Sequence, residues 1–221
     1  GDLAALATFG PYTGHHHQYD RLSLVVWPFS KDAGSPLYAL PARKAWYPHS
    51  YAHNTLVVDG QSHAPSGGEL SSWDGHKLAI SAPDAYPGIR FERSIEMVNA
   101  KIHDQLWVEA GERHTFDWLF HVDGVVSPSC NMRQIDQPLS EEGPAALITL
   151  NGEQVVQAEV TFLIKHSQNR YQLTLRGEDP FTLLIGTCPG TSRTPTSRRT
   201  IIIGRTIGTK QRYSTEIKQI L

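Results

Sequence analysis

Short apolar runs that end at turn residues recur along this chain, and they predict β-strands. Residues 22–27 are mostly apolar and stop at Pro28, and residues 54–58 run into Asp59-Gly60, a dipeptide typical of tight turns. No long stretch free of Gly and Pro carries apolar residues at the spacing of three and four that marks a helix. The pattern therefore predicts an all-β protein.

The spacing of these runs favours an antiparallel β-sandwich formed by residues 1–221 as one domain, because short strands with turn residues between them are typical of that architecture. Further strands are expected at 161–166, 170–176, 181–185, 200–204 and 212–217. Residues 146–150 and 155–160 flank Asn151-Gly152, which predicts a hairpin there. Residues 128–144 have the weakest strand signal, so we expect a loop or a subdomain join.

Composition excludes several classes of function. The net charge is −2, which argues against a general binder of nucleic acid or of anionic membranes. No apolar run approaches the roughly 20 residues that span a bilayer. The two cysteines, Cys130 and Cys188, allow one disulfide or two free thiols. The chain starts at Gly1 without a signal-peptide pattern, so we expect it to be part of a longer or processed protein.

Histidines and acidic residues gather in four short segments near predicted strand ends. The segments are 14–20, 31–34, 51–60 and 114–121. Histidine and aspartate from separate strands can form the first shell of a zinc ion, can orient one catalytic histidine, or can be hydrogen-bonded core residues. Asp117 and His121 share a face at strand spacing, which predicts that they brace a sheet.

Three segments carry a resemblance to a known family. They are 10–23, the run Ala-His-Asn-Thr at 52–55 that leads into Asp59-Gly60, and 114–121. In their order and spacing they resemble the C-terminal β-sheet domain of the heparinase II/III-like polysaccharide lyases, which include oligo-alginate lyases. The resemblance implies a β-sandwich that follows an N-terminal α/α-toroid, with the active-site cleft between the two. The toroid is not within this chain, so the chain alone is expected to be incomplete and inactive.

The resemblance also implies roles for individual residues. Such lyases cleave uronate polymers by β-elimination, in which a base removes the C5 proton and an acid protonates the leaving O4. Aligned on Asp20, the catalytic histidine is His16. Tyr47 and Asn54 are expected to contact substrate.

The zinc ligands of metal-bearing relatives fall on Asp32 and His53, whereas Gln18 stands where those relatives have a third ligand, a histidine. Glutamine is a poor zinc ligand, so bound zinc is one expectation and a metal-free polar brace of Asp32 and His53 is the other. A shift of one residue would make His15 catalytic and His17 the ligand. Neighbouring strand residues point to opposite faces, so the two alignments exclude each other.

The implied partners are a uronate-containing glycan, of the alginate or the heparin and heparan sulfate type, and the N-terminal toroid; a homodimer is compatible with the resemblance. The implied location is a bacterial periplasm or secretion, with the cytoplasm as the alternative. A second hypothesis is a non-catalytic carbohydrate-binding or structural β-sandwich. It follows from Gln18 and from the family's main acid/base tyrosine, which lies on the toroid.

Overall fold

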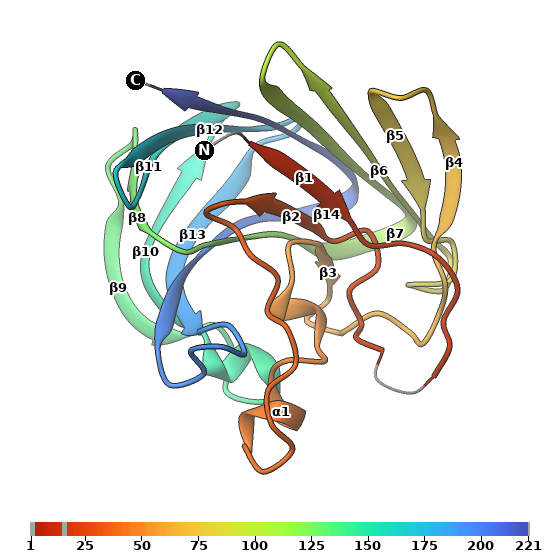
Figure 1. Ribbon diagram of the computed structural model, residues 1–221, viewed down its shortest axis with the longest axis horizontal. Coiled ribbons are helices and arrows are strands. Elements are labelled where there is room, and N and C mark those ends of the chain that lie inside the picture. Colours follow the sequence, from red (N-terminus) through yellow and green to blue (C-terminus); the bar gives the residue numbers. More distant parts are fainter. Residues whose placement is uncertain (1–2, 15–16, 221) are drawn as a thin grey trace.

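The computed structural model describes residues 3–14 and 17–220, and nearly all of its regular structure is β (Figure 1). Its first strands are β1 (Ala4–Ala7), β2 (Leu24–Trp27), β3 (Leu56–Val58), β4 (Glu69–Trp73), β5 (Lys77–Ser81), β6 (Ile89–Val98) and β7 (Lys101–Val122). They are followed by β8 (Val125–Pro128), β9 (Arg133–Pro138), β10 (Thr149–Val156), β11 (Glu159–His166), β12 (Asn169–Gly177), β13 (Phe181–Pro189) and β14 (Arg198–Ile220). The described helices are single turns: α1 (Ala42–Ala45), η1 (Ser50–Ala52) and η2 (Pro144–Leu147).

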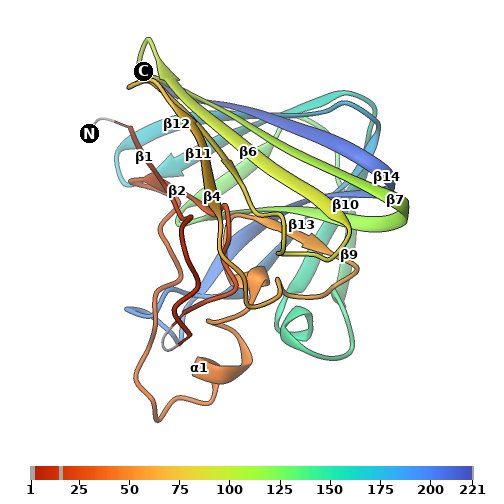
Figure 2. The same cartoon turned by 90° about the vertical axis from the view of Figure 1, so that its right-hand side faces the viewer.

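Two long strands, β7 and β14, belong to both layers of the molecule (Figure 2). Residues 101–109 of β7 pair with 210–218 of β14, and this pair lies in a sheet with the order β4-β5-β6-β7-β14-β12-β11-β8. After a register shift between Gly208 and Lys210, residues 114–122 of β7 pair with 200–208 of β14. This second pair lies in a sheet half with the order β3-β7-β14-β13-β10-β9. The predicted antiparallel β-sandwich is confirmed.

The core between the two sheet halves is apolar because strand alternation sends every second side chain inward. On β7 the inward residues are Phe116, Trp118, Phe120 and Val122, all fully buried. The rings of Trp118 and Phe120 stack with centroids 5.7 Å apart. Apolar residues of β11, β12 and β14 close this core from the opposite layer.

A second apolar cluster covers the outer face of the β7–β14–β13 half. There Leu119, Ile201 and Ile203 pack against Trp46 and Tyr51, from the segment that holds α1 and η1. This segment lies at the lower end of the molecule in Figure 1, and both chain ends lie at the upper end. We call this segment, which holds α1 and η1, the covering segment. The residues of the candidate site lie on it and on the strand face that it covers.

Two expectations about local structure are wrong. Asn151-Gly152 does not form a hairpin turn: it lies inside β10, where the register shifts between Leu150 and Gly152 against both β9 and β13. A glycine inside a strand often marks such a bulge. Residues 128–144, expected as a loop or a join, contain β9, which pairs with β10. No helix among the described residues has the length and apolar character needed to cross a membrane.

Candidate functional site

Asp32 and His53, the two expected metal ligands, meet in the structure. His53 Nδ1 lies 3.3 Å from Asp32 Oδ2, and His53 Nε2 lies 3.0 Å from the carbonyl oxygen of Tyr47. His53 is buried, whereas the Asp32 side chain is 39% exposed. Burial raises the pKa of Asp32, but the hydrogen bond and charge of His53, the Gly34 N–H and the charge of Arg199 outweigh it and lower the pKa to about 2.

The donor set at this pair does not fit a tetrahedral zinc ion. Nowhere in the described ranges do three His, Cys, Asp or Glu side chains come together in a way that could hold a metal. The third expected position, Gln18, donates its amide nitrogen to the carbonyl of Gly34 at 2.8 Å. Both ring nitrogens of His53 already face oxygen atoms of the protein, Asp32 Oδ2 and the Tyr47 carbonyl. The geometry is that of a hydrogen-bonded brace.

His16, the expected catalytic residue, lies outside the described residues, as does His15. The chain next to them is described. His17 contacts Thr13, with its Nε2 2.7 Å from the threonine hydroxyl. Gln18 binds the 32–34 turn, so the segment that follows His16 is anchored beside the Asp32–His53 pair.

Tyr47 is placed inside the protein. Only 1% of its surface is exposed, and its hydroxyl donates to the carbonyl of Gly190 at 3.0 Å. Burial raises the pKa of this hydroxyl. The bond joins the covering segment to the loop after β13, whose Ser192 N–H donates to the Ala33 carbonyl. Contact of Tyr47 with substrate stays a prediction.

Asn54 is also buried, and its amide is fully used by the protein. Its nitrogen donates to the Leu24 carbonyl and the Ser30 hydroxyl, at 2.6 and 2.7 Å. Its oxygen lies 2.7 Å from the backbone nitrogen and 2.9 Å from Nδ1 of His121. This geometry makes Asn54 a brace between strands, and a contact with substrate stays a prediction.

His121 and Asp117 share one face of β7, as predicted, and both are fully buried. Burial, aided by the charge of Arg199, lowers the pKa of His121 well below its ordinary value. Its ring is therefore neutral and donates to one of its two oxygen neighbours, Asn54 Oδ1 or the Tyr51 carbonyl.

Two arginines of β14, which the sequence analysis did not single out, hold the covering segment from below. Arg199, 5% exposed, donates to the carbonyls of Lys31 and Ala52 at 2.8 and 2.9 Å, directly before Asp32 and His53. Arg205 forms a two-pronged ion pair with Asp117, at 2.7 and 2.8 Å. Every second residue of a strand points to the same face, so Arg199 and Arg205 lie on the same buried face as Ile201 and Ile203.

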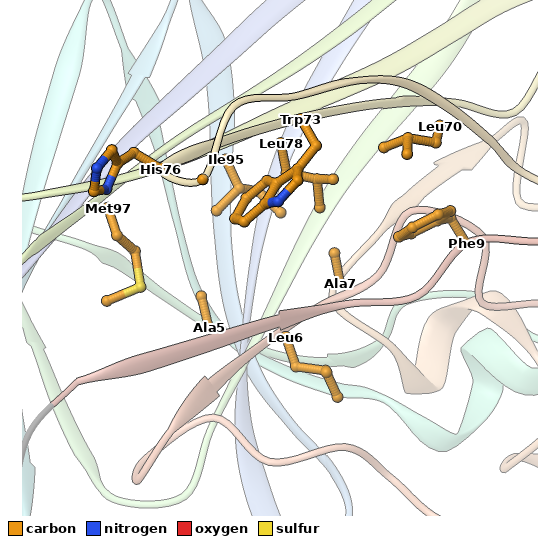
Figure 3. Close-up of a pocket in the computed structure, with 11 residues that line it drawn as sticks. Ala5, Leu6, Ala7, Phe9, Leu70, Trp73, His76, Leu78, Ile95 and Met97 are labelled. Atoms are coloured by element: carbon orange, nitrogen blue, oxygen red, sulfur yellow. The ribbon is translucent and has the colours of Figure 1, made fainter.

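A separate apolar hollow of about 470 Å³ lies between β1 and the β4–β5 hairpin. In Figure 3, Trp73 occupies its middle, with Phe9 and Leu70 toward one end and Met97 and His76 toward the other. Its lining holds one titratable side chain, His76. It lacks the grouped polar residues of the Asp32–His53 region.

The described strands define an antiparallel β-sandwich, and the sequence matches the model of one family over residues 1–214, described as heparinase II/III-like, C-terminal. The chain belongs to this family, which confirms the resemblance. A search of curated proteins finds no match.

Solved structures agree with this fold. A heparinase III chain superposes with a TM-score of 0.70 at 16% identity, over 98% of this chain and 32% of that one. The heparan sulfate lyase HepC from Pedobacter heparinus gives 0.70 at 13% identity, over 98% and 33%. A galactose mutarotase related enzyme from Lactobacillus acidophilus gives 0.51 at 9% identity, over 99% and 97%. At these identities the likeness shows the fold alone, and this chain spans about a third of the length of the two lyases.

Proposed function

We propose that this chain is the β-sandwich part of a polysaccharide lyase that cleaves uronate-containing glycans by β-elimination. The observation that supports it most is the family match over residues 1–214, within which the Asp32–His53 pair and Gln18 come together at the 32–34 turn. Among the substrates, a heparan sulfate type of glycan is favoured over alginate, because similar folds include heparan sulfate lyases.

In this proposal the residues of the chain divide the work between chemistry and positioning. The C5 proton of a uronate becomes acidic enough to remove only when the carboxylate is neutralised by hydrogen bonds or positive charge. His16 is the proposed proton-transfer residue, and the N-terminal domain supplies its partners. The ionised Asp32 holds His53 from one side and the Tyr47 carbonyl holds it from the other. This brace lies beside Gly34, to which Gln18, two residues after His16 in the sequence, is hydrogen-bonded.

The test uses the longer protein with its N-terminal domain. We expect heparan sulfate or another uronate polymer to give the ultraviolet absorbance of a C4=C5 unsaturated product. His16→Ala should abolish most turnover with little change in Tm, and His76→Ala, at the apolar hollow, serves as the matched control. Absence of product from every uronate polymer would overturn the proposal and leave the non-catalytic carbohydrate-binding domain.

A further inference from the structure

A polar hollow of about 660 Å³ lies beside η1 and is lined by neither Asp32 nor His53. Its walls are the turn after β3, with Asp59 and Gln61, and the segment before η2, with Ser140 and Glu142. Tyr51 and Arg205 also line it.

Arg205 is held in one orientation at the hollow by buried partners. Its Nε and Nη2 donate to the two carboxylate oxygens of Asp117, and the hydroxyl of Tyr51 donates to the same carboxylate at 2.9 Å. The hydrogen bond to Asp117 raises the pKa of Arg205, so its charge is permanent. The Tyr51 hydroxyl also interacts with Arg205, and 30% of the arginine side chain is exposed. Asp117 takes two of the five N–H donors of the guanidinium, so Arg205 offers further donors in a plane that Asp117 fixes.

The remaining charges around the hollow are few. Asp59 is already engaged, with Oδ2 2.6 Å from His114 Nδ1 and Oδ1 accepting the Thr115 N–H at 2.8 Å. Glu142 lies exposed at the rim. Gln61 and Ser140 contribute neutral polar groups. A densely sulfated segment needs several cations, whereas this lining has one fixed guanidinium, amide and hydroxyl groups, and two carboxylates, of which Asp59 is already engaged. Such a lining suits a ligand with no more than one carboxylate and with several hydroxyls.

We propose that this hollow is a binding subsite for a carboxylate-bearing sugar residue, with Arg205 on the carboxylate and with Gln61 and Ser140 on the hydroxyls. The identity of the ligand rests on the proposed function, but binding itself can be measured without any lyase activity. The hollow adjoins the candidate site through η1, because Tyr51 lines the hollow and His53 follows two residues later.

The experiment titrates the isotope-labelled chain with glucuronate and follows amide chemical shifts by NMR, with glucose and inorganic sulfate as comparison ligands. We expect glucuronate to shift the amides near Gln61, Thr115 and Ser140, and to bind at least about tenfold more tightly than glucose, because a charged hydrogen-bonded pair contributes about 1.5–3 kcal/mol. Equal affinity for glucose, tighter binding of sulfate, or no binding of glucuronate would overturn the proposal.

Two variants separate binding from folding. Arg205→Lys keeps a positive charge but loses the fork, so we expect at least about tenfold weaker binding. Ser140→Trp fills the hollow from an exposed position and leaves the Arg205–Asp117–Tyr51 contacts in place, so it should abolish binding with an unchanged Tm. The matched control is Arg212→Lys, at an arginine that stacks on Trp107 in the other sheet half, and it should bind as the wild type does.

The two proposals fail separately. Glucuronate bound at this hollow by a chain whose longer form cleaves no uronate polymer would refute the lyase and keep the subsite. Glucuronate binding that Ser140→Trp leaves intact would refute the subsite and leave the lyase standing.

Discussion

The two faces of the β7–β14 half bury different chemistry. The inner face presents Trp118 and Phe120 to an apolar core, whereas the outer face combines its own apolar cluster with Asp117, Arg199 and Arg205, which bond to the covering segment or to each other. Apolar burial is strong but non-directional, so the inner face holds the layers together without fixing one arrangement of loops. Hydrogen bonds and ion pairs have defined geometry, so the outer face fixes where η1 and His53 lie. Both faces therefore contribute to stability through apolar burial, but only the outer face adds the directional bonds that fix the site geometry.

Removing the inner aromatic should have the largest effect. Trp118→Ala deletes a fully buried side chain, which costs about 3–5 kcal/mol of unfolding free energy because the surroundings fill the cavity only in part. Chemical denaturation followed by circular dichroism measures this loss. Trp73→Ala, at a tryptophan 60% exposed, is the control and should stay within about 0.5 kcal/mol. Equal effects at the two sites would contradict this account of the inner core.

Removing the outer-face carboxylate should cost less and act locally. Asp117→Ala leaves Arg205 and Tyr51 without their acceptor, and we expect a loss of about 2 kcal/mol, since hydrogen bonds to charged groups contribute about 1.5–3 kcal/mol each and Arg205 regains water. Asp117→Asn keeps part of the bonding and should lose less. Hydrogen exchange should show weaker protection of the Ala52 and His53 amides than of the β6–β7 ladder. Uniform loss across both would mean that the outer face carries no positional role.

A pH dependence, which is small near neutral pH and grows under acidic conditions, sharpens the comparison for buried histidines. Burial lowers the pKa of His63 from 6.5 to about 3, and the neutral ring accepts from the Arg21 N–H and donates to the Leu56 carbonyl. Below pH 6.5 the His63 ring takes up a proton in the unfolded chain but stays neutral in the folded chain. The free energy of unfolding therefore falls as the pH drops from about 6.5 to about 3. The slope from this residue is up to about 1.4 kcal/mol per pH unit.

Urea denaturation at a series of pH values measures this slope. His63→Gln removes the titrating ring and should reduce the slope, whereas His76→Gln, at an exposed histidine, should leave it unchanged. An unaltered slope in His63→Gln would contradict a neutral buried His63.

The sequence predicts the fold class because strand periodicity and turn residues are local signals, and it predicts the shared face of Asp117 and His121 for the same reason. It does not predict that β7 and β14 bend through both layers, because that bend depends on pairing between distant segments. The bulge at Gly152 shows the same limit. Asn-Gly is a local turn signal, but here β9 and β13 pair with β10 on both sides of it, and this pairing is not local in sequence. Tyr47 and Asn54 bond to the carbonyls of Gly190 and Leu24, which no local pattern reveals. Arg199 and Arg205 were detectable in principle, because the run at 201–203 predicts burial on both faces.

The position of β14 in the chain has a consequence for synthesis on the ribosome. β14 pairs with β7, β12 and β13 and therefore lies at the centre of both layers, yet it comprises residues 198–220. While it is still inside the ribosomal tunnel, β7 and β13 expose unpaired edges, and such edges invite aggregation. Folding of the sandwich must therefore wait until β14 has emerged, and fast pairing of β14 with β7 and β13 shortens the time for which those edges are exposed.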